Sequence, residues 1–314
     1  MTTRTFAPGD MDLPIVDAHH HFFLLQEGRS YPWLQEEYDD SFFLGSYRSM
    51  CRFFGVEEYR RAVAGFDVVA DVHVEAERSR NEQVAETVDL SALHAETSSP
   101  SVIVGHVGFT QPDRDVVLAA HAKHPLVRGI RSKPIISKGP QDSVAGRAGT
   151  LQDPRWQEGL AALAQHHFSW DLRVPFWHLS EAAEVVSEHP EVPVVLNHAG
   201  LPLDRSPAGL AMWRTGMEKL AALPHVTVKV SELGLRDGRW DAESNQLVVR
   251  ETVKMFGFER SMFASNLPVC SLSTSFAEVV LTILRALPRA SDAELRALFA
   301  GTATAAYRMP SRRA

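Results

Sequence analysis

Short apolar runs alternate with longer amphipathic stretches along most of the chain. The runs are rich in Val and Ile and are mostly bounded by Gly, Pro or polar residues, which is typical of β-strands. Several are apolar on both faces, as in parallel strands that are covered by helices. The pattern predicts eight strands, at residues 13–19, 66–75, 101–109, 127–130, 168–174, 192–197, 226–230 and 261–264.

Helix signals fall between these runs. Asp153 and Pro154 are a typical N-cap and first helical residue. Ser180 is expected to cap the next helix, and Ser291 forms a capping box with Glu294 near the end of the chain. Strands that alternate with helices predict a parallel sheet with right-handed crossovers.

Eight strands are the number that closes a (β/α)₈ barrel, and we expect this fold in preference to an open doubly wound sheet. An open sheet of that kind would have a glycine-rich first βα turn, whereas this chain has three histidines and a phenylalanine at 19–22. No repeat, low-complexity stretch or linker divides the chain. We therefore expect one (β/α)₈ TIM-barrel domain over residues 13–309, between short tails at 1–12 and 310–314.

The first predicted βα connection, residues 22–59, is unusually long and aromatic. Such a loop is expected either to pack as a minor hydrophobic cluster or to form a lid over the barrel mouth. Its aromatic residues are Tyr31, Trp33, Tyr38, Phe42, Phe43, Tyr47, Phe53 and Phe54.

Composition narrows the class of protein. The 314 residues carry a net charge of −7, which argues against binding to nucleic acid or to anionic membranes. Cys51 and Cys270 lie far apart in the sequence, which excludes a disulfide framework and a cysteine zinc site. No apolar run reaches the ~18 residues of a membrane span, and the start lacks the apolar stretch of a signal peptide. We expect a cytoplasmic protein without nucleic-acid or membrane partners, with assembly into a homo-oligomer left open.

Three of the 14 histidines stand together at the end of the first predicted strand. Because side chains alternate along a strand, Asp17, His19 and His21 are expected to share one face. His19 and His21 can then hold one cation or one substrate group between them, at the barrel end where active sites gather. His20 points the other way and is expected to be structural.

Four segments, in order along the chain, carry a family resemblance: 15–22 (IVDAHHHF), 127–131 (VRGIR), 196–202 (LNHAGLP) and 262–269 (MFASNLPV). Together they resemble the amidohydrolase superfamily, specifically its amidohydrolase-2 branch. That branch contains sugar-acid lactonases and 2-pyrone-4,6-dicarboxylate lactonase, with aromatic-acid decarboxylases as more distant relatives. The resemblance extends over nearly the whole chain and implies a (β/α)₈ hydrolase.

The resemblance also implies roles for matching residues. His19 and His21 match the first-strand His-x-His and His198 matches the sixth-strand histidine, so these three are the implied metal ligands. The implied cofactor is one divalent ion, Zn or Mn, with a metal-independent site as the alternative. Asn266 stands where the family has an aspartate that binds metal or acts as the general base. An amide cannot take up a proton at neutral pH and is a weaker ligand, although it can orient a water or stabilise an oxyanion.

Cationic residues follow the fourth predicted strand. Arg128 and Arg131 match a segment that is similar to the carboxylate-binding region of the dicarboxylate lactonase. With Lys133 they are expected to form a cationic wall for a substrate carboxylate, a role that suits arginine. The alternative is that they form ion pairs with Glu75 or Asp71.

Other strand ends offer replacements for the missing aspartate. His73 and Glu75 are expected to share a face at the end of the second strand. His73 would contact the substrate and Glu75 would be a general base. The alternative for Glu75 is an ion pair with an arginine such as Arg131. Glu232, after the seventh strand, is either a surface-loop residue or the displaced carboxylate. His178, after the fifth strand, is either a catalytic residue or a histidine of the rim.

The leading interpretation is a lactonase-like hydrolase that acts on a cyclic ester of a small carboxylic acid. His19, His21 and His198 would polarise the scissile carbonyl directly or through a divalent ion. Glu75 or His178 would activate water, and Asn266 would position it. The second interpretation is a metal-assisted decarboxylase or another C–C lyase that acts on a small aromatic acid. The third is a non-catalytic relative that binds a small acid.

Overall fold

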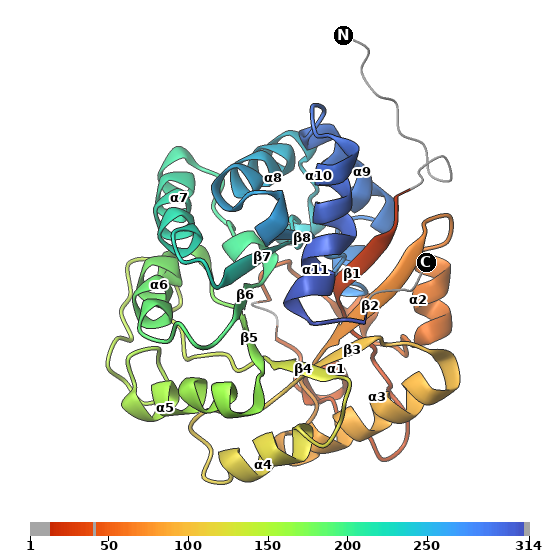
Figure 1. Ribbon diagram of the computed structural model, residues 1–314, viewed down its shortest axis with the longest axis vertical. Coiled ribbons are helices and arrows are strands. Elements are labelled where there is room, and N and C mark those ends of the chain that lie inside the picture. The colour runs from red at the N-terminus through yellow and green to blue at the C-terminus, as the bar shows by residue number, and fades with distance from the viewer. Residues whose placement is uncertain (1–12, 40–41, 311–314) are drawn as a thin grey trace.

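The computed structural model describes residues 13–39 and 42–310, so the predicted tail at 1–12 and most of the tail at 310–314 lie outside the described residues. Eight parallel strands form one sheet in sequential order, each followed by helical structure on the outside, which is a (β/α)₈ barrel (Figure 1). The strands are β1 (Ile15–His20), β2 (Val68–Val74), β3 (Val102–Gly105), β4 (Val127–Ile130), β5 (Ser169–Leu172), β6 (Val194–Leu196), β7 (Val226–Val230) and β8 (Ser261–Phe263).

The barrel closes between its first and last strands. The backbone N–H of Asn266 donates to the carbonyl oxygen of His19 at 2.7 Å, and the N–H of His21 donates to that of Leu267 at 2.7 Å. All eight predicted strands are confirmed, several of them one to four residues shorter at an end. The closing bonds bring the two segments that follow β1 and β8 side by side.

The helices surround the barrel (Figure 1). The predicted caps of Asp153 and of the Ser291–Glu294 capping box are confirmed, because Asp153 accepts from Arg155 and Ser291 accepts from Glu294. The predicted cap of Ser180 is wrong: the helix already begins at Leu179, so the Ser180 side chain lies within its first turn. The helices are α1 (Pro32–Gln35), α2 (Val56–Ala62), α3 (Gln83–Thr97), α4 (Arg114–His121), α5 (Pro154–Ala162), α6 (Leu179–Ser187), α7 (Pro207–Ala221), α8 (Ala242–Phe256), α9 (Phe276–Ala286), α10 (Asp292–Arg296) and α11 (Thr302–Ala306).

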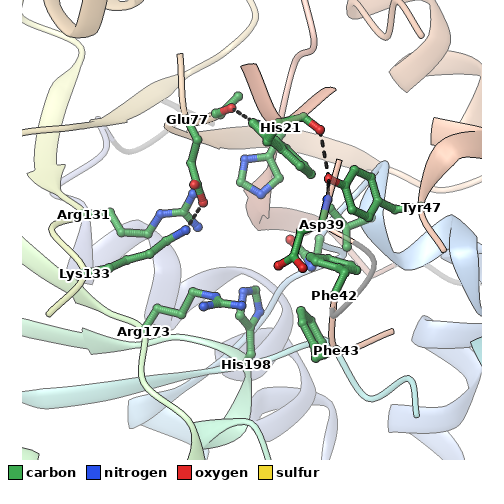
Figure 2. Close-up of a pocket in the computed structure, with 14 residues that line it drawn as sticks. His21, Asp39, Phe42, Phe43, Tyr47, Glu77, Arg131, Lys133, Arg173 and His198 are labelled. Atoms are coloured by element: carbon green, nitrogen blue, oxygen red, sulfur yellow. Dashed lines mark hydrogen bonds and ion pairs between the residues drawn. The ribbon is translucent and has the colours of Figure 1, made fainter. Parts of the chain in front are cut away.

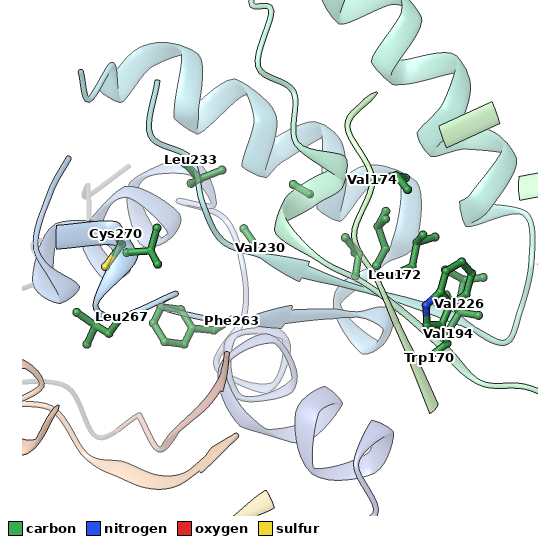
Figure 3. Packing of buried hydrophobic residues seen from close by; sticks show 14 of the residues in the cluster. Trp170, Leu172, Val174, Val194, Val226, Val230, Leu233, Phe263, Leu267 and Cys270 are labelled. Atoms are coloured by element: carbon green, nitrogen blue, oxygen red, sulfur yellow. The ribbon is translucent and has the colours of Figure 1, made fainter. Parts of the chain in front are cut away.

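Two layers of apolar side chains stabilise the barrel. The inner layer contains valines from β1, β2, β3 and β6, and Tyr307 after α11 packs into the same cluster. The outer layer fills the space between strands and helices with larger residues such as Trp170, Leu172 and Phe263 (Figure 3). Alternation of inner and outer residues is what a closed parallel sheet requires.

A β-bulge in β1 changes which residues face the interior. Asp17 pairs with Asp71 of β2 but His20 pairs with His73, so β1 uses one residue more than β2 over this stretch. Asp17 consequently points outward, where the hydroxyl of Tyr59 on α2 donates to it at 3.0 Å, while His19 turns inward. The prediction that Asp17 shares a face with His19 and His21 is therefore wrong.

The segment 22–59 combines the two expectations for it. Tyr31 and Phe54 are buried in the outer apolar layer, Trp33 and Phe43 line a cavity at the carboxyl ends of the strands, and Tyr47 does both. None of the helices in the described part of the chain is both long and apolar enough to span a membrane.

Candidate active site

A cavity of about 250 Å³ lies at the carboxyl ends of the strands (Figure 2). Its polar residues come from the segments that follow β1, β2, β4, β5, β6 and β8, which is where (β/α)₈ enzymes carry their active sites, and they include the carboxylates of Asp39 and Glu77. Trp33, Phe42, Phe43 and Tyr47 of the segment 22–59 line it from one side. The polar lining includes His21, Arg131, Lys133, Arg173, His198 and Asn266.

The first two site histidines form a chain of hydrogen bonds whose direction can be assigned. His21 Nδ1 lies 2.7 Å from the carbonyl oxygen of Val74, which can only accept, so Nδ1 carries the proton and Nε2 has the lone pair. The ammonium of Lys229, which can only donate, lies 3.3 Å from Nδ1 of His19. The proton of a neutral His19 ring is therefore on Nε2, which donates to Nε2 of His21 at 3.3 Å. Burial and the neighbouring cations hold the pKa of both rings well below the usual value, in keeping with neutral imidazoles.

Lys229 belongs to a fully buried charge network inside the barrel. Its ammonium lies 2.5 Å from Oδ1 of Asp171 on β5, which also accepts from Tyr307 and from Asn197. Burial lowers the pKa of Lys229, and Asp171 opposes that shift. This network was not predicted from the sequence. A signal for it was present, because Lys229 lies in the apolar strand β7 on the inward face, between two valines that point outward.

His198 completes the group of three histidines. Its ring centroid lies 4.6 Å from that of His19, and its Nδ1 is 2.9 Å from Oγ of the buried Ser231. If Ser231 accepted this bond, its hydroxyl proton would be buried without a partner among the described residues, so we assign Ser231 as the donor. Nε2 of His198, which lines the cavity, then carries the proton. Burial and the nearby Arg173 hold the pKa of His198 well below its usual value.

Asn266 and Glu232 form a direct pair between the ends of β8 and β7. Nδ2 of Asn266 donates to Oε2 of Glu232, which leaves the buried Oδ1 of Asn266 without a partner in the described part of the chain. Both residues have left-handed backbone conformations, with φ of 58° and 50°, a strained state that is common at functional sites. Glu232 is only 4% exposed, so it is not a surface-loop residue. Burial raises the pKa of its carboxyl to about 7.

Of the predicted cationic wall, Arg131 and Lys133 line the cavity, together with Arg173, which was not predicted. Arg131 forms a 2.7 Å ion pair with Glu75, and Lys133 pairs with Glu77. Arg173, directly after β5, also lines the cavity and has no ion-pair partner among the described residues; its guanidinium lies 5.6 Å from the ring centroid of Phe43. Its position at a strand end was the available sequence signal.

Arg128 lies outside the cavity. It is the second residue of β4, whereas the cavity is lined by residues that follow the strand. Its guanidinium donates to the carbonyl oxygen of Pro125, before the strand, and its own carbonyl accepts from Arg308 near the chain end. The structure therefore separates Arg128 from Arg131 and Lys133.

Glu75 and His73 also lie apart from the cavity lining. His73 points outward from β2, with Nε2 3.5 Å from Glu86 of α3 and Nδ1 accepting from the N–H of Phe22. Glu75 is buried against Arg131, which holds its pKa at about 2 although burial opposes this shift. A carboxylate with so low a pKa is a weak base, so the alternative of an ion pair with Arg131 describes Glu75.

His178 uses both ring nitrogens in contacts outside the cavity. Its Nε2 accepts from the backbone N–H of Ser137 at 3.0 Å, and its Nδ1 lies 2.5 Å from Glu181 of α6. The structure places it in the wall between two loops, as the alternative of a rim histidine describes.

The histidine cluster does not fit the implied metal ion. A histidine that binds a metal normally donates its other ring N–H to an acceptor, but Nδ1 of His19 faces the ammonium of Lys229. Lys229 thus favours the tautomer in which Nε2 of His19 is protonated and has no lone pair for a metal. Within residues 13–39 and 42–310, no three His, Cys, Asp or Glu side chains are arranged to hold a metal ion.

Comparisons with known proteins agree with this architecture. The uncharacterized protein y4mH of Sinorhizobium fredii is 30% identical over 95% of this chain and 99% of its own length. The L-fucono-1,5-lactonase of Burkholderia multivorans is 28% identical over 94% of this chain and 96% of its own. A crystal structure of an amidohydrolase from Burkholderia multivorans with bound zinc is 28% identical, with a TM-score of 0.76 and coverage of 94% of this chain and 99% of that one.

The sequence profile of the amidohydrolase family matches residues 16–309, nearly the whole described barrel. This match includes three of the segments on which the sequence resemblance rests in full, and the first segment from residue 16 onward. The chain belongs to the amidohydrolase family, in its amidohydrolase-2 branch.

Proposed function

We propose that this protein is a lactonase that hydrolyses a cyclic ester of a small carboxylic acid without a metal ion. The observation that carries the proposal is the arrangement of neutral hydrogen-bonding groups beside Arg173, a cation without a carboxylate partner among the described residues (Figure 2). His198 and Asn266 line the cavity, and Arg173 contributes the guanidinium. A similar protein named L-fucono-1,5-lactonase supports a lactone as the substrate class.

His198 is suited to stabilise the carbonyl oxygen of the lactone. His198 lines the cavity, and the donor Ser231 leaves the ring proton on Nε2. Negative charge develops on the carbonyl oxygen when water attacks, and a preorganised donor stabilises that charge. Because burial keeps the ring neutral, it acts as a hydrogen-bond donor.

Arg173 is suited to bind the substrate carboxylate. Burial and the neighbouring Arg131 lower its pKa to about 10, so it remains charged at neutral pH. Arg131 and Lys133 already have carboxylate partners, which leaves Arg173 as the cation that gains most from an anionic ligand. The cavity of about 250 Å³ is small for a ligand site, which favours a compact substrate.

The aromatic residues of the segment 22–59 would cover the ring of the substrate. Phe42 and Phe43 present apolar surface across the cavity from Arg131 and Lys133 (Figure 2), and Trp33 also lines the cavity. Such a cover limits water access and strengthens the hydrogen bonds beneath it.

The proposal is tested by incubating the purified protein with a panel of five- and six-membered lactones, with and without a carboxylate. Hydroxy-acid formation is followed by proton NMR, and carbon dioxide release from aromatic acids is measured in parallel. We expect hydrolysis of a carboxylated lactone and no carbon dioxide. Carbon dioxide release without lactone hydrolysis would establish a decarboxylase, and ligand binding without either reaction would establish a non-catalytic relative.

A further inference from the structure

The hydrogen bond between Glu232 and Asn266 raises the question of which group removes a proton from water. Asn266 lines the cavity but cannot act as a base. Glu75 and Glu77, the carboxylates nearest the cationic wall, each hold a cation. Glu232 does not itself line the cavity, but one of its carboxylate oxygens is hydrogen-bonded to Asn266, which does. Its other oxygen, Oε1, has no partner in the described part of the chain.

We propose that Glu232, on the segment after β7, is the general base of this site. Its carboxylate accepts a hydrogen bond from the side-chain amide of Asn266, on the segment after β8. The inference rests on the proposed function and adds the residue that activates water. Asn266 acts with it: Nδ2 donates to Glu232, which leaves Oδ1 without a partner among the described residues and able to accept a hydrogen bond from the attacking water.

The reaction balances with water as the only co-reactant. The water oxygen forms a bond to the lactone carbonyl carbon while one water proton moves to Oε1 of Glu232. The tetrahedral intermediate then collapses, and the bond from this carbon to the ring oxygen breaks. The ring oxygen takes the proton from Glu232, which restores the carboxylate and yields the open hydroxy acid.

The surroundings of Glu232 match this task. The side chain of Asn266 and the guanidinium of Arg173 after β5 are the polar groups that lower its pKa, and Glu232 in turn raises the pKa of the buried thiol of Cys270 after β8. Burial raises the pKa of Glu232 to about 7, and Asn266 and Arg173 oppose the rise. A base whose pKa lies near neutral pH combines a substantial ionised fraction with good proton affinity.

The test compares wild type with Glu232→Gln, Asn266→Asp and the exchanged pair Glu232→Gln/Asn266→Asp, using a lactone that the wild type hydrolyses. We expect Glu232→Gln to lower kcat/KM by about 100- to 10,000-fold, as loss of a general base does. The exchanged pair restores a carboxylate beside the same water, and we expect it to recover at least about tenfold over Glu232→Gln. The wild-type kcat/KM should rise with pH through about 7, and this rise should be absent in Glu232→Gln.

Two controls separate chemistry from folding. Glu251→Gln, which alters a carboxylate in an ion pair with Arg214 on the outer helices, should leave kcat/KM unchanged. Glu232→Gln should melt no lower than wild type at pH 8, because it removes a buried charge, and it should bind the hydroxy-acid product with wild-type affinity. Asp39→Asn, at an exposed carboxylate that also lines the cavity, tests the competing base.

Each outcome decides the inference. If Glu232→Gln keeps kcat/KM within about threefold of wild type, or if Asp39→Asn loses more activity than Glu232→Gln, Glu232 is not the base and the lactonase proposal still stands. If the exchanged pair remains as inactive as Glu232→Gln, the shared role of the two positions is overturned. If wild type hydrolyses no lactone, both the proposed function and this inference fail.

Discussion

The ammonium of Lys229 lies 3.3 Å from Nδ1 of His19, inside the barrel and beside the group of three site histidines. This contact fixes which nitrogen of His19 carries the proton, and the chain of donors continues through His21 to the carbonyl oxygen of Val74. The buried network thus sets the protonation of the site from within the barrel. It also explains why these histidines suit hydrogen bonding better than metal binding.

The first prediction concerns the stability of this network. Asp171→Ala leaves the ammonium of Lys229 buried without its counter-ion, and we expect a loss of about 3–5 kcal/mol in the free energy of unfolding. Urea denaturation at pH 7 measures this loss. The matched double variant Asp171→Leu/Lys229→Met removes both charges, so it should be clearly more stable than Asp171→Ala. Equal destabilisation of the two variants would show that packing, and not the unpaired charge, dominates.

The second prediction concerns zinc affinity. Lys229→Met removes the ammonium behind His19 and frees the ring to place its proton on Nδ1. We expect this variant to bind zinc at least about tenfold more tightly than wild type, in line with the usual effect of residues behind a metal ligand. Titration calorimetry with zinc measures both proteins, with His19→Ala/Lys229→Met as the control for binding elsewhere. Tight stoichiometric binding to wild type would contradict the assigned tautomer.

The third prediction concerns the pH dependence of stability. The pKa of Glu75 is lowered from 4.5 to about 2, so the pair with Arg131 stabilises the fold above pH 4.5 and loses this effect as the pH falls toward 2. We expect Glu75→Gln to be less stable than wild type by about 3 kcal/mol at pH 7. In urea denaturation at several pH values, the difference should shrink below pH 4.5. A difference that stays constant from pH 7 to pH 3 would count against the ion pair as its source.

The fourth prediction concerns recognition of the carboxylate. A hydrogen bond to a charged group contributes about 1.5–3 kcal/mol, so Arg173→Gln should raise KM for a carboxylated lactone roughly 10- to 100-fold. Steady-state kinetics with a neutral lactone of the same ring size provides the control and should change little. Lys133→Gln is the matched variant, and its effect should be smaller because Glu77 already engages Lys133. Similar losses with charged and neutral lactones would place the carboxylate elsewhere.

Much of the fold could be predicted because its signals are local. The eight strands and the Asp153 and Ser291 caps follow from apolar runs and capping residues, and strand ends in a barrel converge at one place. The orientation of Asp17 could not be predicted, because the bulge between Asp17 and His20 depends on the register against β2. Strict alternation fails wherever a strand has one extra residue.

The positions of the site residues could be predicted from the sequence better than the contacts that these residues make with one another. His19, His21, His198 and Asn266 lie together, as strand-end positions indicate. Whether a carboxylate forms an ion pair with a cation depends on contacts between segments that are far apart in the sequence. Glu75 meets Arg131 across 56 positions of sequence, and Glu232 meets Asn266 across 34. Partners of this kind leave no periodic signal in one sequence.

Metal-independent lactone hydrolysis is tested most directly by one rate measurement. The purified enzyme is treated with EDTA, and hydrolysis of the carboxylated lactones is followed by proton release with the chelator still present. We predict that one of them is hydrolysed with kcat/KM of at least about 10⁴ M⁻¹s⁻¹, equal to that of the untreated enzyme. Hydrolysis that EDTA abolishes and zinc or manganese restores, or no hydrolysis under either condition, would contradict it.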